Sequence, residues 1–304
     1  MTAALSLRTT IGRAALGWCL LSSAVWAAAP ESYGTQDEPA LRLAVERDYP
    51  PFVFVGPSGQ AQGLSIDMLR LVQEATGLRV VERPPAPLQT LLTDLREGKA
   101  DLITSLRPTP ERAVFLEFTR PYIQVPAILV VRTDHAPMAI ADALTALRGR
   151  PVAVGHGYAV EAAMRKAHPH VAWQAVSDDT QALQGVSDGR FEAAVADTAS
   201  VAYIVQTQGL QGLRSAGRVG FDYDLSFGIR HGQPGLRERM DAAILGISRP
   251  QRQAVIDRWL QPLNPNALGR GPIWPAVLGT GLLGGGLLLL GWKAWRPPAK
   301  PPHA

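Results

Sequence analysis

Hydroxyl groups and arginines are concentrated between Thr104 and Tyr122, in the segment TSLRPTPERAVFLEFTRPY. Thr109 is a good N-cap for a helix, and Pro110 suits the first helical position because its missing N–H is not needed there. Arg112 would then lie in the first turn, next to free backbone N–H groups. A guanidinium beside a helix N-terminus can bind a carboxylate through charge-assisted hydrogen bonds. The segment therefore predicts a carboxylate site at Arg112.

Spacing alone leaves a second interpretation of Arg112 open. Glu111 and Glu117 are near enough in the sequence to form a surface ion pair with it, and such pairs contribute little. The position of the segment favours ligand binding. It follows the apolar run ADLI, which has the pattern of a strand, and ligands of open α/β sheets bind beyond the carboxyl ends of such strands.

Strand and helix patterns alternate before this segment, as in a parallel sheet covered by helices. LRLAVE, LRVVER and ADLITS have the apolar composition of strands. GLSIDMLRLVQEATG and PLQTLLTDLREG have the helical spacing of apolar residues, and the first of them ends at Gly77. Residues 40–130 are expected to form the first part of lobe 1.

The same alternation restarts at residue 151 and predicts a second lobe over residues 131–217. The extended run VPAILVVRTD, residues 125–134, would join the two lobes. Residues 218–264 offer one strand and two helices, too little for a third domain, so we expect them to return to lobe 1. The predicted fold class is α/β, a two-lobed fold in which each lobe is a mainly parallel sheet flanked by helices.

The N-terminal residues 1–29 resemble a secretory signal peptide. Arg8 and Arg13 precede the apolar stretch AALGWCLLSSAVWAAAP, which ends in small residues near Ala29. An uncleaved anchor helix is the alternative. The one cysteine of the chain, Cys19, lies in this segment, so the mature chain would have no disulfide and no cysteine ligand for a metal.

Residues 272–292 are expected to form a transmembrane helix. The stretch GPIWPAVLGTGLLGGGLLLLGW carries no charge and is long enough to cross a bilayer. Lys293, Arg296 and Lys300 follow in the tail 293–304, which the positive-inside rule places in the cytoplasm. A buried core helix is the alternative. The two termini thus predict a periplasmic domain anchored in the bacterial inner membrane.

The positive charge of the chain belongs to its two ends. The net charge is +4, and removing the five cations of the first 28 and last 33 residues leaves about −1 for the middle. A basic face that could bind nucleic acid is therefore not expected.

Catalytic and metal-binding patterns are weak. GVSDG, residues 185–189, fits a hydrolase nucleophile pattern, but that pattern needs a strand leading into a helix, and here a helix ends. The histidines at 156, 168, 170 and 231 do not have the spacing of a zinc site. We expect no catalytic residues, no metal and no cofactor.

Several motifs resemble family 3 periplasmic solute-binding proteins. These are DYPPFVF, GLSIDMLRLVQEATGL, LREGKADLITSLRPTPERAVFLEFTRPY, GYAVEAAMRKAHP and EAAVADTASVAYIV. Three motifs are most similar to the Venus-flytrap sensor modules of unorthodox sensor histidine kinases. They are SLRPTPER, FTRPY, and RWL just before the apolar segment. The resemblance spans residues 40–262 and implies a two-lobed module that closes on a small ligand.

The resemblance also implies roles for single residues. In amino-acid-binding members of the family, the arginine of TPER binds the ligand α-carboxylate, and here that residue is Arg112. Ser105 is expected to assist it, and Asp197 to bind the α-ammonium group. Tyr49 would pack on the ligand, and Glu46 holds the usual acidic position at the end of the first strand.

Two departures from the family pattern concern specificity. Arg107 replaces the usual Ser or Thr and adds a second positive group. Gly157 and Tyr158 stand where transport proteins often have Gly-Thr-Thr, so a phenol replaces a hydroxyl contact. The ligand therefore need not be a standard amino acid.

The function implied is that of a membrane-tethered binding and sensing protein for a small carboxylate-bearing metabolite, an amino acid or a related compound. The alternative is an anchored substrate-binding component of an ABC-type amino-acid uptake system. An enzyme is not expected. The 12 residues after Trp292 are too few for a kinase domain, so the partner would be a separate sensor kinase or an ABC permease.

Overall fold

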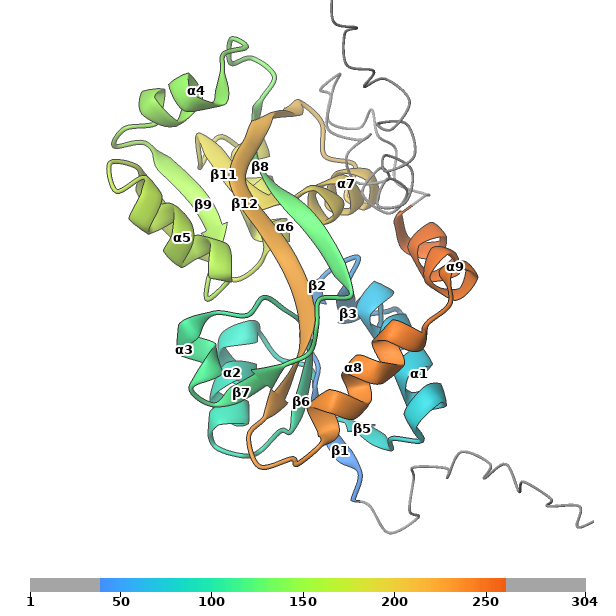
Figure 1. Cartoon of the computed structure of the whole chain (residues 1–304). Coiled ribbons are helices and arrows are strands. Elements are labelled where there is room, and N and C mark those ends of the chain that lie inside the picture. Colours follow the sequence, from blue (N-terminus) through green and yellow to red (C-terminus); the bar gives the residue numbers. More distant parts are fainter. Residues whose placement is uncertain (1–38, 261–304) are drawn as a thin grey trace, which may run out of the picture. The chain divides into compact units, whose positions relative to one another are not determined.

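A computed structural model describes residues 39–260 of the chain, which fall within one structural unit (Figure 1). The expected signal peptide and transmembrane helix lie outside the described residues. Within residues 39–260, every helix is too short or too polar to cross a membrane.

Lobe 1 is built on the strand–helix alternation that the sequence predicts. Its parallel strands are β5, β1 and β6, in that order, and helices α1 and α2 connect them. Helix α1 ends because Gly77 adopts the left-handed conformation with φ of 70°, which glycine reaches without strain. The elements are β1 (Leu41–Ala44), α1 (Leu64–Thr76), β5 (Val80–Glu82), α2 (Leu88–Arg96) and β6 (Leu102–Leu106).

Lobe 2 repeats this arrangement. Strand β9 pairs in parallel with β10 on one side and β11 on the other, as three nearly uninterrupted apolar strands should when helices cover both faces. The elements are α4 (Ile140–Ala146), β9 (Pro151–Gly155), α5 (Ala159–Ala167), β10 (Ala172–Val176), α6 (Asp179–Ser187), β11 (Ala193–Asp197) and α7 (Thr198–Thr207).

Two long antiparallel strands join the lobes, β8 (Ile123–Arg132) and β12 (Leu213–Arg230) (Figure 1). β12 pairs with β6 and with β7 (Leu116–Phe118) in lobe 1, and β8 pairs with β11 in lobe 2. The expectation of mainly parallel sheets thus holds only for the three strands at each end of the sheet, β10, β9 and β11 in lobe 2 and β6, β1 and β5 in lobe 1. Because the chain crosses to lobe 2 and back, the complete sheet is mixed.

The last two described helices pack against lobe 1. They are α8 (Leu236–Gly246) and α9 (Arg249–Leu260), and both contact α1. Asp67 of α1 accepts hydrogen bonds from Trp259 Nε1 at 2.7 Å and Arg258 Nη1 at 3.2 Å.

A small antiparallel sheet follows β1 and was not expected from the sequence. It consists of β2 (Asp48–Tyr49), β3 (Val53–Val55) and β4 (Ala61–Gln62). These strands have only two or three residues, too few to show a period. The sheet places Tyr49 and Phe52 in the core, where both are buried.

Candidate functional site

The turn that carries Arg112 forms as its sequence predicts. Helix α3 (Pro110–Ala113) begins with Pro110 in its first turn, and Thr109 caps it by accepting a hydrogen bond from the Arg112 N–H at 3.3 Å. Only 6% of Arg112 is exposed. The cap and the proline therefore direct this arginine into the protein interior.

The guanidinium of Arg112 connects the two lobes. Nη1 donates to the backbone oxygen of Arg107 in lobe 1 at 2.7 Å, and Nη2 donates to the backbone oxygen of Gly157 in lobe 2 at 2.8 Å. Burial lowers the pKa of Arg112 to about 10, so the group stays charged at neutral pH. Glu117 pairs with Arg237. The charge of Glu111 raises the pKa of Arg112 in part, but the burial of Arg112 argues against a surface salt bridge.

A second contact between the lobes joins Tyr158 and Glu46. The Tyr158 hydroxyl donates to Glu46 Oε1 at 3.0 Å, and the Tyr158 ring packs on Tyr49 with centroids 5.4 Å apart. Burial raises the pKa of Glu46 from 4.5 to about 7, because the hydrogen bond and the charge of Arg112 offset only part of the desolvation. Tyr158, which stands where transport proteins often have a threonine, thus forms a hydrogen bond to lobe 1.

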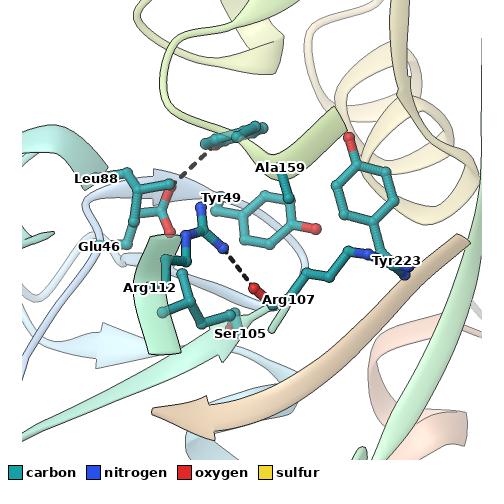
Figure 2. Close-up of a pocket in the computed structure, with 10 residues that line it drawn as sticks. Glu46, Tyr49, Leu88, Ser105, Arg107, Arg112, Ala159 and Tyr223 are labelled. Carbon is teal, nitrogen blue, oxygen red and sulfur yellow. Dashed lines mark hydrogen bonds between the residues drawn. The ribbon is translucent and has the colours of Figure 1, made fainter. Parts of the chain in front are cut away.

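The side chains between the lobes enclose a small cavity. Figure 2 shows Glu46 and Arg112 on its lobe 1 side, with the rings of Tyr49 and Tyr223 nearby. Its volume is about 20 Å³, which holds a water molecule but not an amino acid. A larger ligand therefore requires the lobes to separate or the side chains between them to move.

Ser105 lies at the end of β6 in a left-handed conformation with φ of 57°, which is strained for a residue other than glycine. Its N–H donates to the Tyr122 hydroxyl at 2.9 Å, and that hydroxyl donates to Ser65 at 2.8 Å. Ser105 lines the cavity, but its N–H is already bonded within lobe 1.

Arg107 lines the same cavity, and its charge is already paired. Nη1 lies 2.8 Å from Asp224 Oδ2 and also donates to the backbone oxygen of Asp222. The guanidinium carbon stacks 4.4 Å above the ring of Phe221. All three partners belong to β12, so Arg107 holds this strand against lobe 1 and adds little free positive charge to the cavity.

Gly157 lies where the two lobes approach each other closely. Its φ is 78°, and a Cβ on it would be 2.1 Å from Nε2 of Gln89 in lobe 1. Its N–H donates to Glu161 at 2.8 Å. The backbone conformation favours glycine here, and a larger residue would also have to displace the Gln89 side chain.

Asp197 begins α7 as its N-cap. Oδ1 accepts hydrogen bonds from the N–H groups of Ala199 at 2.9 Å and Ser200 at 2.8 Å. Oδ2 has no hydrogen-bond partner within residues 39–260. Burial raises the pKa of Asp197 to about 6, although interactions with Ser200, Tyr49 and Ala199 lower it in part. One oxygen of this buried carboxyl is left for a further donor.

Two residues of this region were not expected from the sequence. Asp179, in the first turn of α6, is 1% exposed, and Tyr223 of β12 is 3% exposed. An aspartate at a helix start usually faces solvent and interacts with the helix dipole. Neither the residue type of Asp179 nor its position in the helix therefore predicted that it is buried. Tyr223 is one of several aromatic residues in β12, and its position at the cavity depends on how that strand crosses between the lobes.

Metal binding finds no support in this region. In the described part of the chain, no three His, Cys, Asp or Glu side chains lie close enough together to hold a metal ion.

Two α/β lobes joined by two crossing strands, with polar side chains of both lobes meeting between them, define a Venus-flytrap binding module. The chain belongs to the bacterial extracellular solute-binding proteins, family 3, whose family model matches residues 41–262.

Curated relatives include both sensors and binding proteins. The virulence sensor protein BvgS of Bordetella bronchiseptica is 27% identical over 272 residues, which cover 87% of this chain and 21% of BvgS. The ABC transporter arginine-binding protein 1 of Escherichia coli is 23% identical, over 75% of this chain and 93% of that protein. The chain thus spans about a fifth of the length of BvgS.

A solved histidine kinase sensor domain, described as similar to periplasmic binding proteins, has the same fold. It superposes with a TM-score of 0.68 at 23% identity and covers 73% of this chain and 96% of the sensor domain. At that identity the likeness concerns the fold.

Proposed function

We propose that this protein is a sensor module that binds an amino-acid-like metabolite between its lobes. The observation that carries the proposal is that Arg112 of lobe 1 and Asp197 of lobe 2 are both buried, and that the side chain of Tyr49, which lines the cavity with Arg112, interacts with each of them. Arg112 would bind the ligand carboxylate and exchange its bond to the Gly157 carbonyl for it. Asp197 would bind the ligand ammonium group through Oδ2, which has no partner within residues 39–260.

The bonds between the lobes favour sensing over delivery. Arg112 and Tyr158 already join the lobes through the protein's own groups, so a closed conformation does not depend on a ligand for these two contacts. A ligand would act by its difference in affinity for the closed and more open conformations. A module that changes between two conformations when a ligand binds can transmit that conformational change to a partner.

The membrane anchor and periplasmic location are part of the proposal. The apolar segment 272–292 and the basic tail 293–304 support a C-terminal anchor, and residues 1–29 support export. The output would pass through a partner such as a sensor kinase. The relationship to BvgS, which carries the word sensor in its name, is consistent with this.

Uptake is the second candidate function. The arginine-binding protein of Escherichia coli matches over 93% of its length, which supports a role in uptake. In that case an ABC permease would be the partner. Binding is proposed in both cases, and catalysis in neither.

Ligand binding can be tested on the purified chain by thermal shift with amino acids and small carboxylic acids. We expect at least one hit. Arg112→Ala and Asp197→Ala should each weaken it by about 30-fold or more, because each leaves a charged ligand group without its buried partner. Normal binding by Arg112→Ala would disprove the carboxylate contact. Normal binding by Asp197→Ala would mean a ligand without an amine there.

A further inference from the structure

Asp179 is a buried carboxyl group without a partner. It is 1% exposed, and neither of its carboxyl oxygens has a hydrogen-bond partner within residues 39–260. Asp197 is 0% exposed, and its Oδ2 likewise has no partner in that range. The two carboxyl groups are close enough to interact, since the charge of Asp197 raises the pKa of Asp179, next to the larger effect of burial. Unpaired buried charges of like sign are strongly unfavourable.

Two tyrosine hydroxyls join this cluster. Tyr49 and Tyr223 are each 3% exposed. The described part of the chain offers no hydrogen-bond partner to the Tyr223 hydroxyl, and the Tyr49 hydroxyl interacts with the carboxyl group of Asp197, whose pKa it lowers in part. The charges of Asp179 and Asp197 raise the pKa of both tyrosines, in addition to burial. Both rings line the cavity between the lobes (Figure 2). Asp179 and Asp197 are not among the residues that line this cavity, but α6, which carries Asp179, contacts both β2, which carries Tyr49, and α7, which Asp197 caps.

The charges around this place do not balance. Three buried carboxyl groups have charges that interact, those of Asp179, Asp197 and Glu46. The guanidinium of Arg112 supplies a positive charge that interacts with Glu46. Arg107 is already paired with a carboxylate of β12. When these carboxyl groups are ionised, a zwitterionic ligand leaves the excess of negative charge unchanged, whereas a ligand of net positive charge reduces it.

We infer that Asp179, with the hydroxyls of Tyr49 and Tyr223, forms a subsite for a second positively charged nitrogen group, so that the ligand is a small organic cation with two such groups. The inference deepens the proposed function and rests on it, because Asp197 is taken as the partner of the first ammonium group. Basic amino acids and small diamines share this chemistry, and they differ in the carboxylate that Arg112 would bind.

A cation fits this subsite better than hydroxyl donors alone would. The phenols can donate to the carboxyl oxygens, but they bring no charge to compensate two carboxylates. An ammonium or guanidinium group donates several hydrogen bonds and supplies the charge, and charge-assisted bonds are the stronger kind. The alternative is that Asp179 stays protonated and serves no ligand.

Binding of matched ligands to the purified full-length chain would test the inference. Arginine and citrulline have nearly the same shape, but citrulline lacks the side-chain charge. Ornithine and norvaline form a second pair of this kind, and putrescine is the diamine without a carboxylate. We expect calorimetry at pH 7.5 to show arginine or ornithine binding at least about 30-fold more tightly than its uncharged counterpart.

The variant Asp179→Asn keeps the shape of the side chain and removes its charge. It should weaken binding of the charged ligand by about 30-fold or more and leave the uncharged counterpart within about threefold. Asp188→Asn is the matched control, since Asp188 follows the same helix and its side chain is 62% exposed. The melting temperature of unliganded Asp179→Asn should equal or exceed that of the unchanged chain, which shows that the variant folds.

Three outcomes would overturn the inference. Equal binding of arginine and citrulline, or unchanged binding of the charged ligand by Asp179→Asn, would disprove the cation subsite while the proposed function stands. If neutral amino acids and cations all fail to bind, the proposed function fails with it. Binding of putrescine that depends on Asp179 but not on Arg112 would instead support the subsite, because putrescine has no carboxylate for Arg112 to bind.

Discussion

The Tyr158 hydroxyl donates a hydrogen bond of 3.0 Å to Oε1 of Glu46 across the space between the two lobes. The two residues are 112 positions apart in the chain. Both are buried, so the bond is protected from competition with water. Together with the bond from Arg112 to Gly157, it makes the closed conformation a property of the protein's own side chains.

Removing the Tyr158 hydroxyl should weaken the closed conformation. Tyr158→Phe leaves the buried Glu46 carboxyl without its donor, and we expect a loss of about 1–3 kcal/mol in the free energy of unfolding by urea. Tyr223→Phe is the control, because the described residues provide no partner for that hydroxyl, and it should change stability by less than about 0.5 kcal/mol. Equal effects of both variants would contradict the assigned role of the bond.

Stability should rise as the pH falls from 8 to 5. The pKa of Glu46 is raised from 4.5 to about 7 by burial, so the folded chain binds this proton more tightly than the unfolded chain does. The stabilisation is complete below about pH 4.5 and is lost as the pH rises towards 7. One pKa unit corresponds to about 1.4 kcal/mol, so Glu46 contributes on the order of 3 kcal/mol.

Other groups bear on the same pH experiment. Asp197, whose pKa is raised to about 6 by burial, acts in the same direction. Asp101 acts in the opposite direction, since the hydrogen bond from Arg42 lowers its pKa to about 2, but that loss begins only below about pH 4. His168 also acts in the opposite direction within this window, since burial lowers its pKa, so only the comparison with a Glu46 variant isolates the contribution of Glu46 to urea unfolding at pH 5 and pH 8. Glu46→Gln should show a clearly smaller pH dependence, and an unchanged dependence would refute the role of Glu46.

Gly157→Ala should disturb the contact between the lobes. The new methyl group would meet the Gln89 side chain, and φ of 78° is strained for alanine. We expect a loss of about 1–3 kcal/mol in unfolding free energy. Gly209→Ala is the matched control, because its φ is 62° but nothing lies within 4 Å of the added carbon. Its loss of unfolding free energy should therefore reflect backbone strain alone.

The double variant Gly157→Ala with Gln89→Ala separates the two causes. Removing the Gln89 side chain relieves the collision but not the backbone strain. The double variant should therefore recover stability to about the level of Gly209→Ala. No recovery would mean that the collision with Gln89 is not the source of the effect.

The orientation in the membrane can be tested with reporter fusions in a Gram-negative host. A reporter that functions only in the cytoplasm should be active after residue 304, and a periplasmic reporter should be active when inserted within residues 210–216. Sequencing of the purified protein should place the mature N-terminus within a few residues of Ala29. The reverse reporter pattern would refute the periplasmic location.

Several elements of this protein form through interactions between residues close together in the chain, and these could be predicted from the sequence. Thr109 and Pro110 start α3 and place Arg112, because a cap bonds to residues only two or three positions away. The alternation of apolar strands and amphipathic helices predicts both α/β lobes for the same reason, since each pattern reflects one element packing on its neighbours. The antiparallel strands that make the sheet mixed were predicted only as an extended connection.

Only the tertiary structure decided what the site residues contact. The sequence suggests a ligand for Arg112 and does not show that its guanidinium bonds to the Gly157 carbonyl, 45 positions away. The pairing of Tyr158 with Glu46 and the burial of Asp179 likewise depend on how the two lobes meet. These contacts arise from packing between segments distant in the chain, and neither residue type nor spacing encodes which distant group will face a given side chain.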